Sequence, residues 1–126
     1  MLEFKKLHKM DNQHLHQNEK MRFLLFSASL RKDSLNTSLI KLAARIIEKN
    51  NGKIDLASMS EFDCPSFNQD SEATSAIPTG ANEFRKRLLA NDAFIISSPE
   101  YNASMPGLLK NVIDWVSRFR PQPFNE

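Results

Sequence analysis

The chain has 126 residues, of which 40% are hydrophobic and 25% are charged, and its formal net charge is +2. This length suits one domain, and the composition is that of an ordinary globular protein. Lysines and arginines are scattered among acids, so neither a nucleic acid nor an anionic membrane is predicted as a partner. No apolar run approaches the roughly 20 residues that span a bilayer, and the N-terminus lacks the apolar core of a secretory signal.

The single cysteine, Cys64, excludes an internal disulfide and fits a reducing compartment, which predicts a cytoplasmic protein. Its acidic neighbour Asp63 should raise the pKa of the thiol rather than lower it. We therefore interpret Cys64 as a packing residue and not as a reactive thiol.

Residues 1–20 show little pattern of secondary structure, and we expect a mobile N-terminal extension ahead of a domain over residues 21–126. The three histidines, His8, His14 and His16, all lie in this extension. A His-x-His pair can bind a metal, but no carboxylate or cysteine completes a ligand set at usable spacing. No metal site is predicted.

The first predicted strand is Arg22–Phe26, which is apolar on both faces as a central parallel strand should be. The loop over residues 27–37 contains four hydroxyls, an arginine, a lysine and an asparagine. A helix over residues 36–49 follows, and Ser34 or Asn36 can cap it. Its expected buried stripe is Leu39, Ile40, Ala43, Ile46 and Ile47.

This loop and the helix that follows have the composition of an anion site. Free backbone N–H groups and the helix dipole favour a phosphate there, and the hydroxyls and Arg31 can add charge-assisted hydrogen bonds. A plain capped helix after a polar turn explains the segment equally well. The loop alone does not decide between the two.

The middle of the chain predicts an edge strand, a long loop and a second helix. Asn51 suits the left-handed C-cap of the first helix, and Lys53–Ala57 alternates weakly, as an edge strand does. Residues 58–80 form a long loop anchored by Phe62 and Phe67, and such a loop is uncommon unless it serves a site or an interface. The helix over residues 81–91 is amphipathic, and its basic run is interpreted as a solvated face. The apolar residues of this helix are Phe84, Leu88 and Leu89, and the basic run is Arg85, Lys86 and Arg87.

The third unit begins with Ala93–Ile96, an apolar run typical of a fully buried strand. A polar loop over residues 97–107 follows, with two prolines, a tyrosine and an asparagine, and it leads into a helix that ends at about Phe119. A strand that ends in a polar loop and feeds a helix is how open α/β sheets build ligand sites.

Three charged residues of the last helix, Lys110, Asp114 and Arg118, recur at intervals of four. This spacing predicts a surface ladder of ion pairs worth a few tenths of a kcal/mol. We interpret Lys110 and Trp115 as structural residues.

Two motifs give the chain a resemblance to the NADPH-dependent FMN reductase family, the flavodoxin-like group that includes quinone, chromate and azo-dye reductases. The first motif is SLRKDSLN, over residues 29–36, and the second is PEYNASMPGLLKNVIDW, over residues 99–115. The second motif is long and specific. The likeness covers about Arg22 to Arg120.

The resemblance implies an α/β fold, a flavodoxin-like three-layer sandwich with a parallel sheet in the order 2-1-3-4-5. This chain would supply the 2-1-3 part, with strands 4 and 5 missing, and FMN would bind at the switch point between strands 1 and 3. The FMN phosphate would be held by Ser29, Arg31, Ser34 and Asn36. The ribityl chain and the isoalloxazine would be lined, largely through backbone groups, by Pro99, Glu100, Tyr101, Asn102 and Ser104.

The implied activity is that of an FMN-dependent NAD(P)H oxidoreductase. Hydride from NADPH or NADH would reach the bound FMN and then a small-molecule electron acceptor, namely a quinone, chromate, an azo compound or free flavin. No catalytic side chain is predicted, because the chemistry belongs to the cofactor. A homodimer or homotetramer is expected. The alternative is a truncated, non-catalytic flavodoxin-like module that serves binding or assembly.

The chain departs from the family at two alanines and at its end. Ala28 and Ala103 stand where the family has glycine, and an alanine that needs positive φ costs about 1 kcal/mol. The family continues for two more strand–helix units, and without them the third strand is an exposed apolar edge. We therefore expect a piece of a longer protein whose core has about 180 residues.

Overall fold

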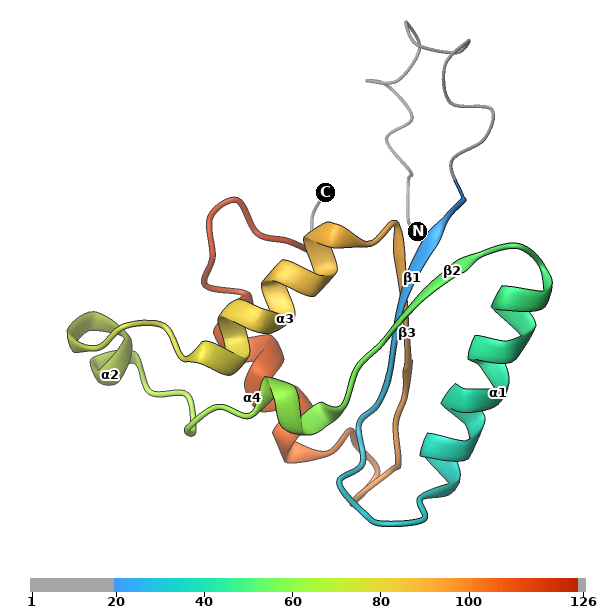
Figure 1. Cartoon of the computed structure of the whole chain (residues 1–126). Helices are drawn as coiled ribbons and strands as arrows, with labels where there is room; N and C mark the ends of the chain where they lie inside the picture. Colours follow the sequence, from blue (N-terminus) through green and yellow to red (C-terminus); the bar gives the residue numbers. More distant parts are fainter. Residues whose placement is uncertain (1–19, 125–126) are drawn as a thin grey trace, which may run out of the picture.

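The computed structural model describes residues 20–124. Most of the expected N-terminal extension, with its three histidines, lies outside the described residues. The elements, in chain order, are β1 (Arg22–Ser27), α1 (Leu35–Lys49), β2 (Lys53–Leu56), the 3-10 helix η1 (Met59–Phe62), α2 (Gln69–Thr74), α3 (Thr79–Ala90), β3 (Ala93–Ser97) and α4 (Gly107–Val116) (Figure 1).

The three strands form one parallel sheet in the order β2-β1-β3. β1 is central, and its residues Leu24, Leu25 and Phe26 are fully buried. In Figure 1, α1 lies on one side of the sheet, while η1, α3 and α4 lie on the other. The predicted α/β class and the strand order 2-1-3 are confirmed.

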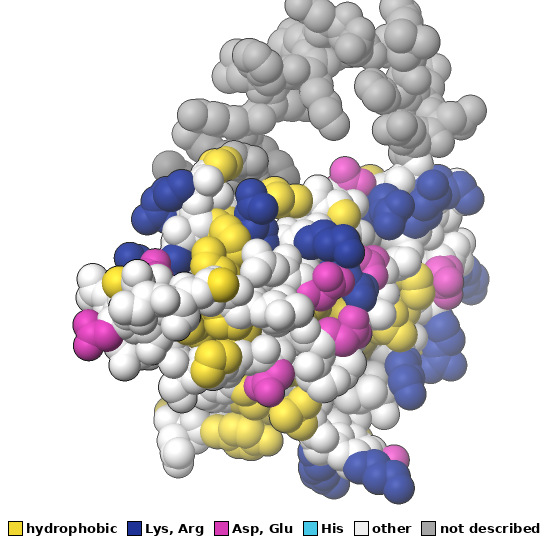
Figure 2. Space-filling model, turned by 60° about the vertical axis from the view of Figure 1, so that its left-hand side comes forward, with side chains coloured by type: hydrophobic (Ala, Val, Ile, Leu, Met, Phe, Trp, Pro, Cys, Tyr) yellow, Lys and Arg dark blue, Asp and Glu magenta, His cyan; other side chains and the backbone are white. Residues whose placement is uncertain are grey.

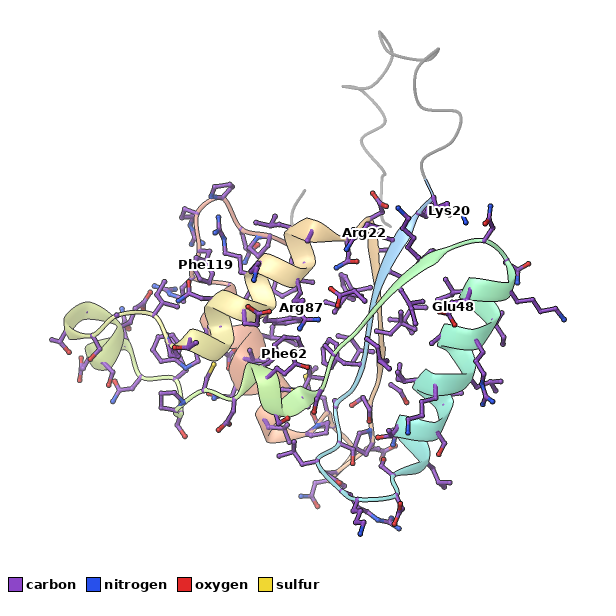
Figure 3. The ribbon with its side chains drawn as sticks, viewed as in Figure 1. Lys20, Arg22, Glu48, Phe62, Arg87 and Phe119 are labelled. Carbon is purple, nitrogen blue, oxygen red and sulfur yellow. The ribbon has the colours of Figure 1, made fainter. Side chains whose placement is uncertain are left out.

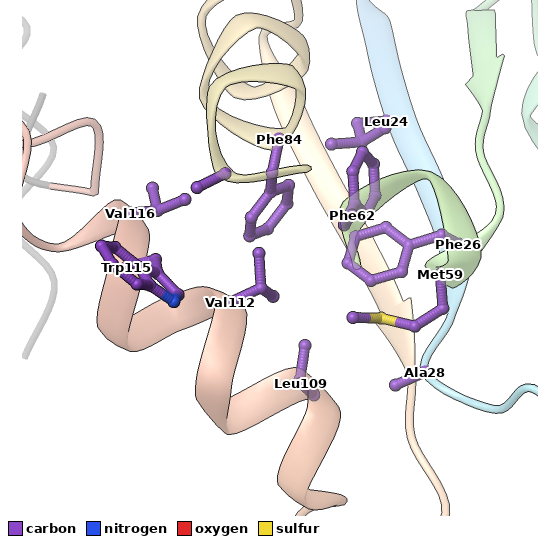
Figure 4. Packing of buried hydrophobic residues seen from close by; sticks show 11 residues of the cluster. Leu24, Phe26, Ala28, Met59, Phe62, Phe84, Leu109, Val112, Trp115 and Val116 are labelled. Carbon is purple, nitrogen blue, oxygen red and sulfur yellow. The ribbon is translucent and has the colours of Figure 1, made fainter. Parts of the chain in front are cut away.

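The face of the sheet toward α3 and α4 carries the larger core (Figure 4). Phe26 meets Phe62 and Phe84 edge-on, with ring centroids 5.1 and 5.5 Å apart. Edge-on aromatic pairs contribute about 0.5–1.5 kcal/mol beyond their buried area. The buried residues of this cluster are Leu24, Phe26, Ala28, Met59, Phe62, Ala81, Phe84, Leu109, Val112, Trp115 and Val116.

The opposite face of the sheet is packed by α1, through a small cluster of Leu25, Ile40 and Ala44. The predicted buried stripe of α1 is wrong at Leu39 and Ile46, which are 56% and 53% exposed. The apolar residues of α1 occupy more than one side of the helix, and a single sheet face cannot cover them all. An apolar surface therefore remains exposed on α1.

The segment predicted as a long loop, residues 58–80, contains η1, α2 and the start of α3. Ser58 caps η1, and its N–H donates to Glu61 Oε1 at 2.7 Å. Asn68 caps α2, and its Oδ1 accepts the Asp70 N–H at 2.9 Å. The polar residues that suggested a loop supply helix caps instead, because short polar side chains bond to nearby backbone N–H groups.

Phe67 anchors this segment as predicted, with its ring centroid 5.0 Å from that of Trp115. Trp115 Nε1–H donates to the Pro65 carbonyl at 2.8 Å. Asn111 Nδ2 donates to the carbonyls of Cys64 and Pro65, each at 3.0 Å. These contacts support the interpretation of Trp115 as a structural residue.

Cys64 is half-buried and packs against the larger core. Burial raises the pKa of its thiol, and the charge of Asp63 raises this pKa further. The thiol also donates to the Phe62 carbonyl at 3.4 Å. The structure thus agrees with a packing role.

The basic run of α3 is not the uniformly solvated face that was predicted. Arg87 pairs with Asp55 of β2, with Glu61 at 2.6 Å and with Glu83 at 2.9 Å, and its side chain is 22% exposed (Figure 3). Hydrogen bonding between Arg87 and Glu83 raises the pKa of the guanidinium and lowers the pKa of the carboxyl. Helical spacing did not reveal Asp55 and Glu61, since they come from other elements.

The charge ladder of α4 is only partly present. Lys110 Nζ lies 2.6 Å from Asp114 Oδ1, as the spacing predicts. Arg118 instead donates to Glu72 of α2 at 2.8 Å. The helix ends at Val116, earlier than expected, so Arg118 leaves the helical register that would have aligned it with Asp114.

β3 has the sequence of a buried strand but lies at the edge of the sheet, where Phe94 and Ile95 are 50% and 38% exposed. Within residues 20–124, no helix is long and apolar enough to cross a bilayer. On the face shown in Figure 2, Lys and Arg side chains stand in separate groups, and acidic side chains lie among them. The expectation of no nucleic-acid partner stays a prediction.

Candidate functional site

The predicted site residues lie at one edge of the sheet. β1 and β3 run parallel with Ser27 opposite Ser97, so the loops that follow them emerge side by side. We name residues 28–34 the first loop and residues 98–106 the third loop. In open α/β sheets, ligands bind at this carboxyl edge of the strands.

Ser97, at the base of the third loop, forms hydrogen bonds to the start of the first loop and to α1. Its hydroxyl donates to Asn36 Oδ1 at 2.6 Å, and its carbonyl accepts the Ala28 N–H at 2.8 Å. Ser97 is 7% exposed, so both bonds are shielded from water. The base of the third loop is thereby fixed against the N-terminus of α1, and Asn36 Nδ2 remains as the donor of that side chain.

Ser97 lies in the polar loop that the sequence predicts as a ligand site, but it was not among the residues predicted to bind the cofactor. A hydroxyl at the first position of the polar loop predicted over residues 97–107 was the available signal. Its partner Asn36 lies 61 positions away in the chain, so only the strand order brings the two together.

The hydroxyls of the first loop can still donate hydrogen bonds to a ligand. Ser34 caps α1, with its Oγ accepting the Asn36 N–H at 3.2 Å, and Ser29 Oγ accepts the Arg31 N–H at 3.3 Å. Each hydroxyl thus accepts from the backbone, and among the described residues neither hydroxyl proton has an acceptor. Both protons are available for an anion.

The N-terminus of α1 adds positive character to this loop. The first N–H groups of a helix have no partner within the helix, and the macrodipole places partial positive charge there. The Arg31 side chain is exposed beside it, whereas Ser34 is buried and Ser29 and Asn36 are half-buried. The first loop therefore has the chemistry of an anion site.

The third loop contains a tight hairpin. Tyr101 and Ser104 exchange two backbone hydrogen bonds of 2.9 and 3.1 Å, and the residues between them, Asn102 and Ala103, have φ of 52° and 59°. This geometry is a type I′ turn, which favours glycine at its second central position. Ala103 is therefore strained by about 1 kcal/mol, because its Cβ disfavours positive φ.

The other alanine that departs from the family pattern carries no such strain. Ala28 is not among the described residues with positive φ, and its side chain is fully buried in the larger core. Ala28 therefore fits its place, and the doubt about glycine replacement concerns Ala103 alone.

The predicted residues of the third loop are mostly exposed. Pro99 is half-buried, whereas Glu100, Tyr101, Asn102 and Ser104 face solvent, with Tyr101 55% exposed. The hairpin already uses the N–H groups of Tyr101 and Ser104. A ligand could therefore accept hydrogen bonds from the backbone N–H groups of the other residues of the third loop. Residues 20–124 hold no group of three His, Cys, Asp or Glu that could bind a metal ion.

Comparison with known proteins agrees with this geometry. Residues 21–126 match the family model described as NADPH-dependent FMN reductase. The chain belongs to this family. The match covers both loops and α1, which together contain every predicted site residue.

Curated relatives show what the chain is similar to. It is 37% identical over 108 residues to an NAD(P)H-dependent FMN reductase of Pseudomonas aeruginosa, covering 86% of this chain and 56% of the relative. It is 38% identical over 90 residues to an NAD(P)H:quinone oxidoreductase of Solanum tuberosum, covering 71% of this chain and 46% of the relative. The chain thus spans about half the length of the curated relatives it matches.

Solved structures support the fold. The flavoenzyme NAD(P)H:(acceptor) oxidoreductase FerB from Paracoccus denitrificans aligns with a TM-score of 0.66 at 33% identity, over 82% of this chain and 54% of that one. An azoreductase from Bacillus anthracis aligns with a TM-score of 0.58 at 16% identity, over 79% of this chain and 56% of that one. The flavodoxin-like fold is confirmed.

Proposed function

We propose that the chain binds FMN across the carboxyl edge of its sheet, between the first and third loops. The observation that carries this proposal is the Ser97–Asn36 hydrogen bond of 2.6 Å, which joins the N-terminus of α1 to the base of the third loop and supports one site between the two loops. Family membership and the names of the relatives support FMN as the ligand.

The first loop is proposed to hold the phosphate. Ser29 and Ser34 donate hydroxyl protons, Arg31 supplies the charge and Asn36 Nδ2 completes the set. Charge-assisted hydrogen bonds to a phosphate are about twice as strong as neutral ones. Anchoring the phosphate here directs the rest of the molecule along the sheet edge toward the third loop.

The third loop is proposed to line the ribityl chain and the isoalloxazine. The type I′ hairpin constrains the backbone of residues 101–104 through two hydrogen bonds. The residues proposed for this role are Pro99, Glu100, Tyr101, Asn102 and Ser104. Their part is to orient the ring and leave one face open.

We infer that the complete protein is an NAD(P)H oxidoreductase. Bound FMN supplies the hydride and electron chemistry, from NADPH or NADH to a small-molecule acceptor. The acceptor classes proposed are quinone, chromate, azo compound and free flavin. No side chain of this chain is proposed as nucleophile or general base, since its residues bind and orient the cofactor.

We also propose a homodimer or homotetramer in the cytoplasm. The exposed Phe94 and Ile95 at the β3 edge support association, and the single free cysteine supports a reducing compartment. The same edge favours a second candidate function, a module that serves binding or assembly without turnover. Oxidation of NADPH or NADH by the FMN-loaded chain separates the two.

Titration with FMN, followed by flavin fluorescence, tests the site. The Arg31→Ala variant should weaken FMN affinity at least tenfold, because a charge-assisted contact of about 1.5–3 kcal/mol is lost. Lys32→Ala, a neighbouring exposed cation, is the matched control and should change affinity less than about twofold. Equal losses in the two variants would indicate a general charge effect, and no saturable FMN binding by the unaltered chain would overturn the proposal.

A further inference from the structure

A pocket of about 110 Å³ lies beside the first loop, between α1 and the end of β2. Five of its nine lining residues are polar, namely Ser27, Ser29, Thr37, Lys41 and Ser58. No carboxylate lines it. All five polar side chains offer hydrogen-bond donors, and one of them is a cation.

This pocket lies on the other side of α1 from the proposed FMN site. Asn36 faces β3, where Ser97 binds it, while Thr37 and Lys41 line the pocket with the residues that follow β2. Thr37 and Lys41 are one helical turn apart, so they share one side of α1. Ser29 is the one polar residue that also belongs to the proposed phosphate loop.

Ser27 is the observation that points to a ligand here. Its side chain is on the same face of β1 as Leu25, two residues earlier, which packs on α1. Ser27 is only 8% exposed, and its Oγ has no hydrogen-bond partner among the described residues. A buried hydroxyl without a partner costs free energy, and a ligand in the pocket would satisfy it.

The size and charge of the pocket indicate which class of ligand it can bind. A volume of about 110 Å³ is that of three or four water molecules, which is enough for one tetrahedral oxyanion. Lys41 makes no ion pair with another described residue. An ammonium without an ion pair among the described residues, beside several hydroxyl donors, matches an anion with several acceptor oxygens.

We propose that this pocket binds a phosphoryl group and forms a second anion subsite next to the FMN loop. This inference goes beyond the proposed function, because the subsite shares Ser29 with the proposed FMN phosphate loop but adds Thr37, Lys41 and Ser58, which are not among the residues proposed to bind FMN. The phosphoryl group comes either from inorganic phosphate or from a phosphorylated nucleotide such as the 2′-phosphate end of NADPH.

Calorimetric titration of the full chain with inorganic phosphate, at constant ionic strength, tests the subsite. Lys41→Met should weaken phosphate affinity about tenfold while leaving FMN affinity within twofold. Lys49→Met, on the last turn of the same helix, is the matched control and should leave phosphate affinity unchanged. The proposal is overturned if the unaltered chain binds no phosphate, if the two variants behave alike, or if Arg31→Ala abolishes phosphate binding and Lys41→Met does not.

A second variant, Ser27→Ala, tests the buried hydroxyl. Without phosphate, its urea midpoint should equal or exceed that of the unaltered chain, because an unsatisfied polar atom is removed. Its phosphate affinity should nevertheless fall severalfold. A lower midpoint together with unchanged phosphate affinity would show that Ser27 serves the fold, and would contradict the proposal.

Competition identifies the source of the phosphoryl group. Adenosine 2′-monophosphate is titrated against bound phosphate, with adenosine as the control. Displacement by the nucleotide and not by adenosine supports the subsite and assigns it to the 2′-phosphate of NADPH. Phosphate binding that depends on Lys41 but resists the nucleotide supports the subsite with inorganic phosphate as its ligand.

Discussion

The two faces of the sheet are covered very differently. Toward α3 and α4, three aromatic rings and the apolar side of α4 form a continuous core, with Phe62 and Val112 fully buried. Toward α1, the buried cluster within residues 20–124 consists of Leu25, Ile40 and Ala44, and Leu39 stays more than half exposed. We name these the closed face and the open face.

The difference shows where the stability of this chain lies. Buried apolar area contributes roughly 25 cal/mol per Å², so the closed face supplies most of the hydrophobic free energy. The proposed cofactor site lies between the faces, with the third loop leading into α4 of the closed face and the first loop into α1 of the open face. The third loop is thus attached to the more extensively packed face of the sheet, and the first loop to the less packed face.

The largest predicted change in stability comes from replacing one apolar residue on the closed face, and an apolar residue on the open face serves as the comparison. Phe62→Ala removes a ring from the centre of the closed face and should lower the free energy of unfolding by about 3–5 kcal/mol. Leu39→Ala on the open face should cost less than about 1 kcal/mol, because that side chain already faces solvent. Urea denaturation measures both, and similar losses would remove the distinction between the faces.

A smaller effect is expected at the rim of the closed face. Arg87→Met leaves Asp55 and Glu61 without their cation and should destabilise the chain by about 2 kcal/mol. Arg45→Met on the exposed side of α1 is the control and should be nearly neutral. Thermal unfolding of both variants measures the two changes in stability. A neutral Arg87→Met would mean that the ion pairs contribute as little as exposed ones do.

The smallest effect concerns the loops, and its sign differs between two alanines. Ala103→Gly should stabilise the chain by about 1 kcal/mol, since glycine accepts positive φ without strain. Ala28→Gly should destabilise it by about 1 kcal/mol, because a buried methyl group is lost and the unfolded chain gains freedom. Urea midpoints give both values, and a loss at Ala103 would contradict the proposed strain.

Much of the fold was predictable from local pattern. The apolar run of β1, the Ser34 cap and the Asn51 position at the end of α1 are set by neighbouring residues, and Asn51 does adopt positive φ of 69°. The strand order, however, followed from family resemblance. Local pattern alone gives strands and not their neighbours.

What could not be predicted depends on contacts between distant segments. The partners of Arg87 come from β2 and η1, and the partner of Arg118 comes from α2, so helical spacing suggested the wrong surroundings for both. The exposure of Leu39 and Ile46 depends on how α1 is rotated above the sheet, and an apolar stripe wider than its binding face leaves this undecided.

The candidate site divides in the same way. Hydroxyls and an arginine before a helix predict an anion loop, since the backbone chemistry is local. The hydrogen bond from Ser97 to Asn36 requires β3 beside β1, which local pattern does not predict. The type I′ hairpin at Asn102 and Ala103 was not predicted, because its second central position is an alanine and not the glycine typical of this turn.

Amide hydrogen exchange of the chain with and without FMN tests most directly whether the two loops form one site. The proposed geometry predicts that saturating FMN slows exchange in residues 28–36 and in residues 98–105 together, while residues 57–62 beyond β2 remain unchanged. Protection confined to one of the two loops, or found only elsewhere, would contradict a shared FMN site at the edge formed by β1 and β3.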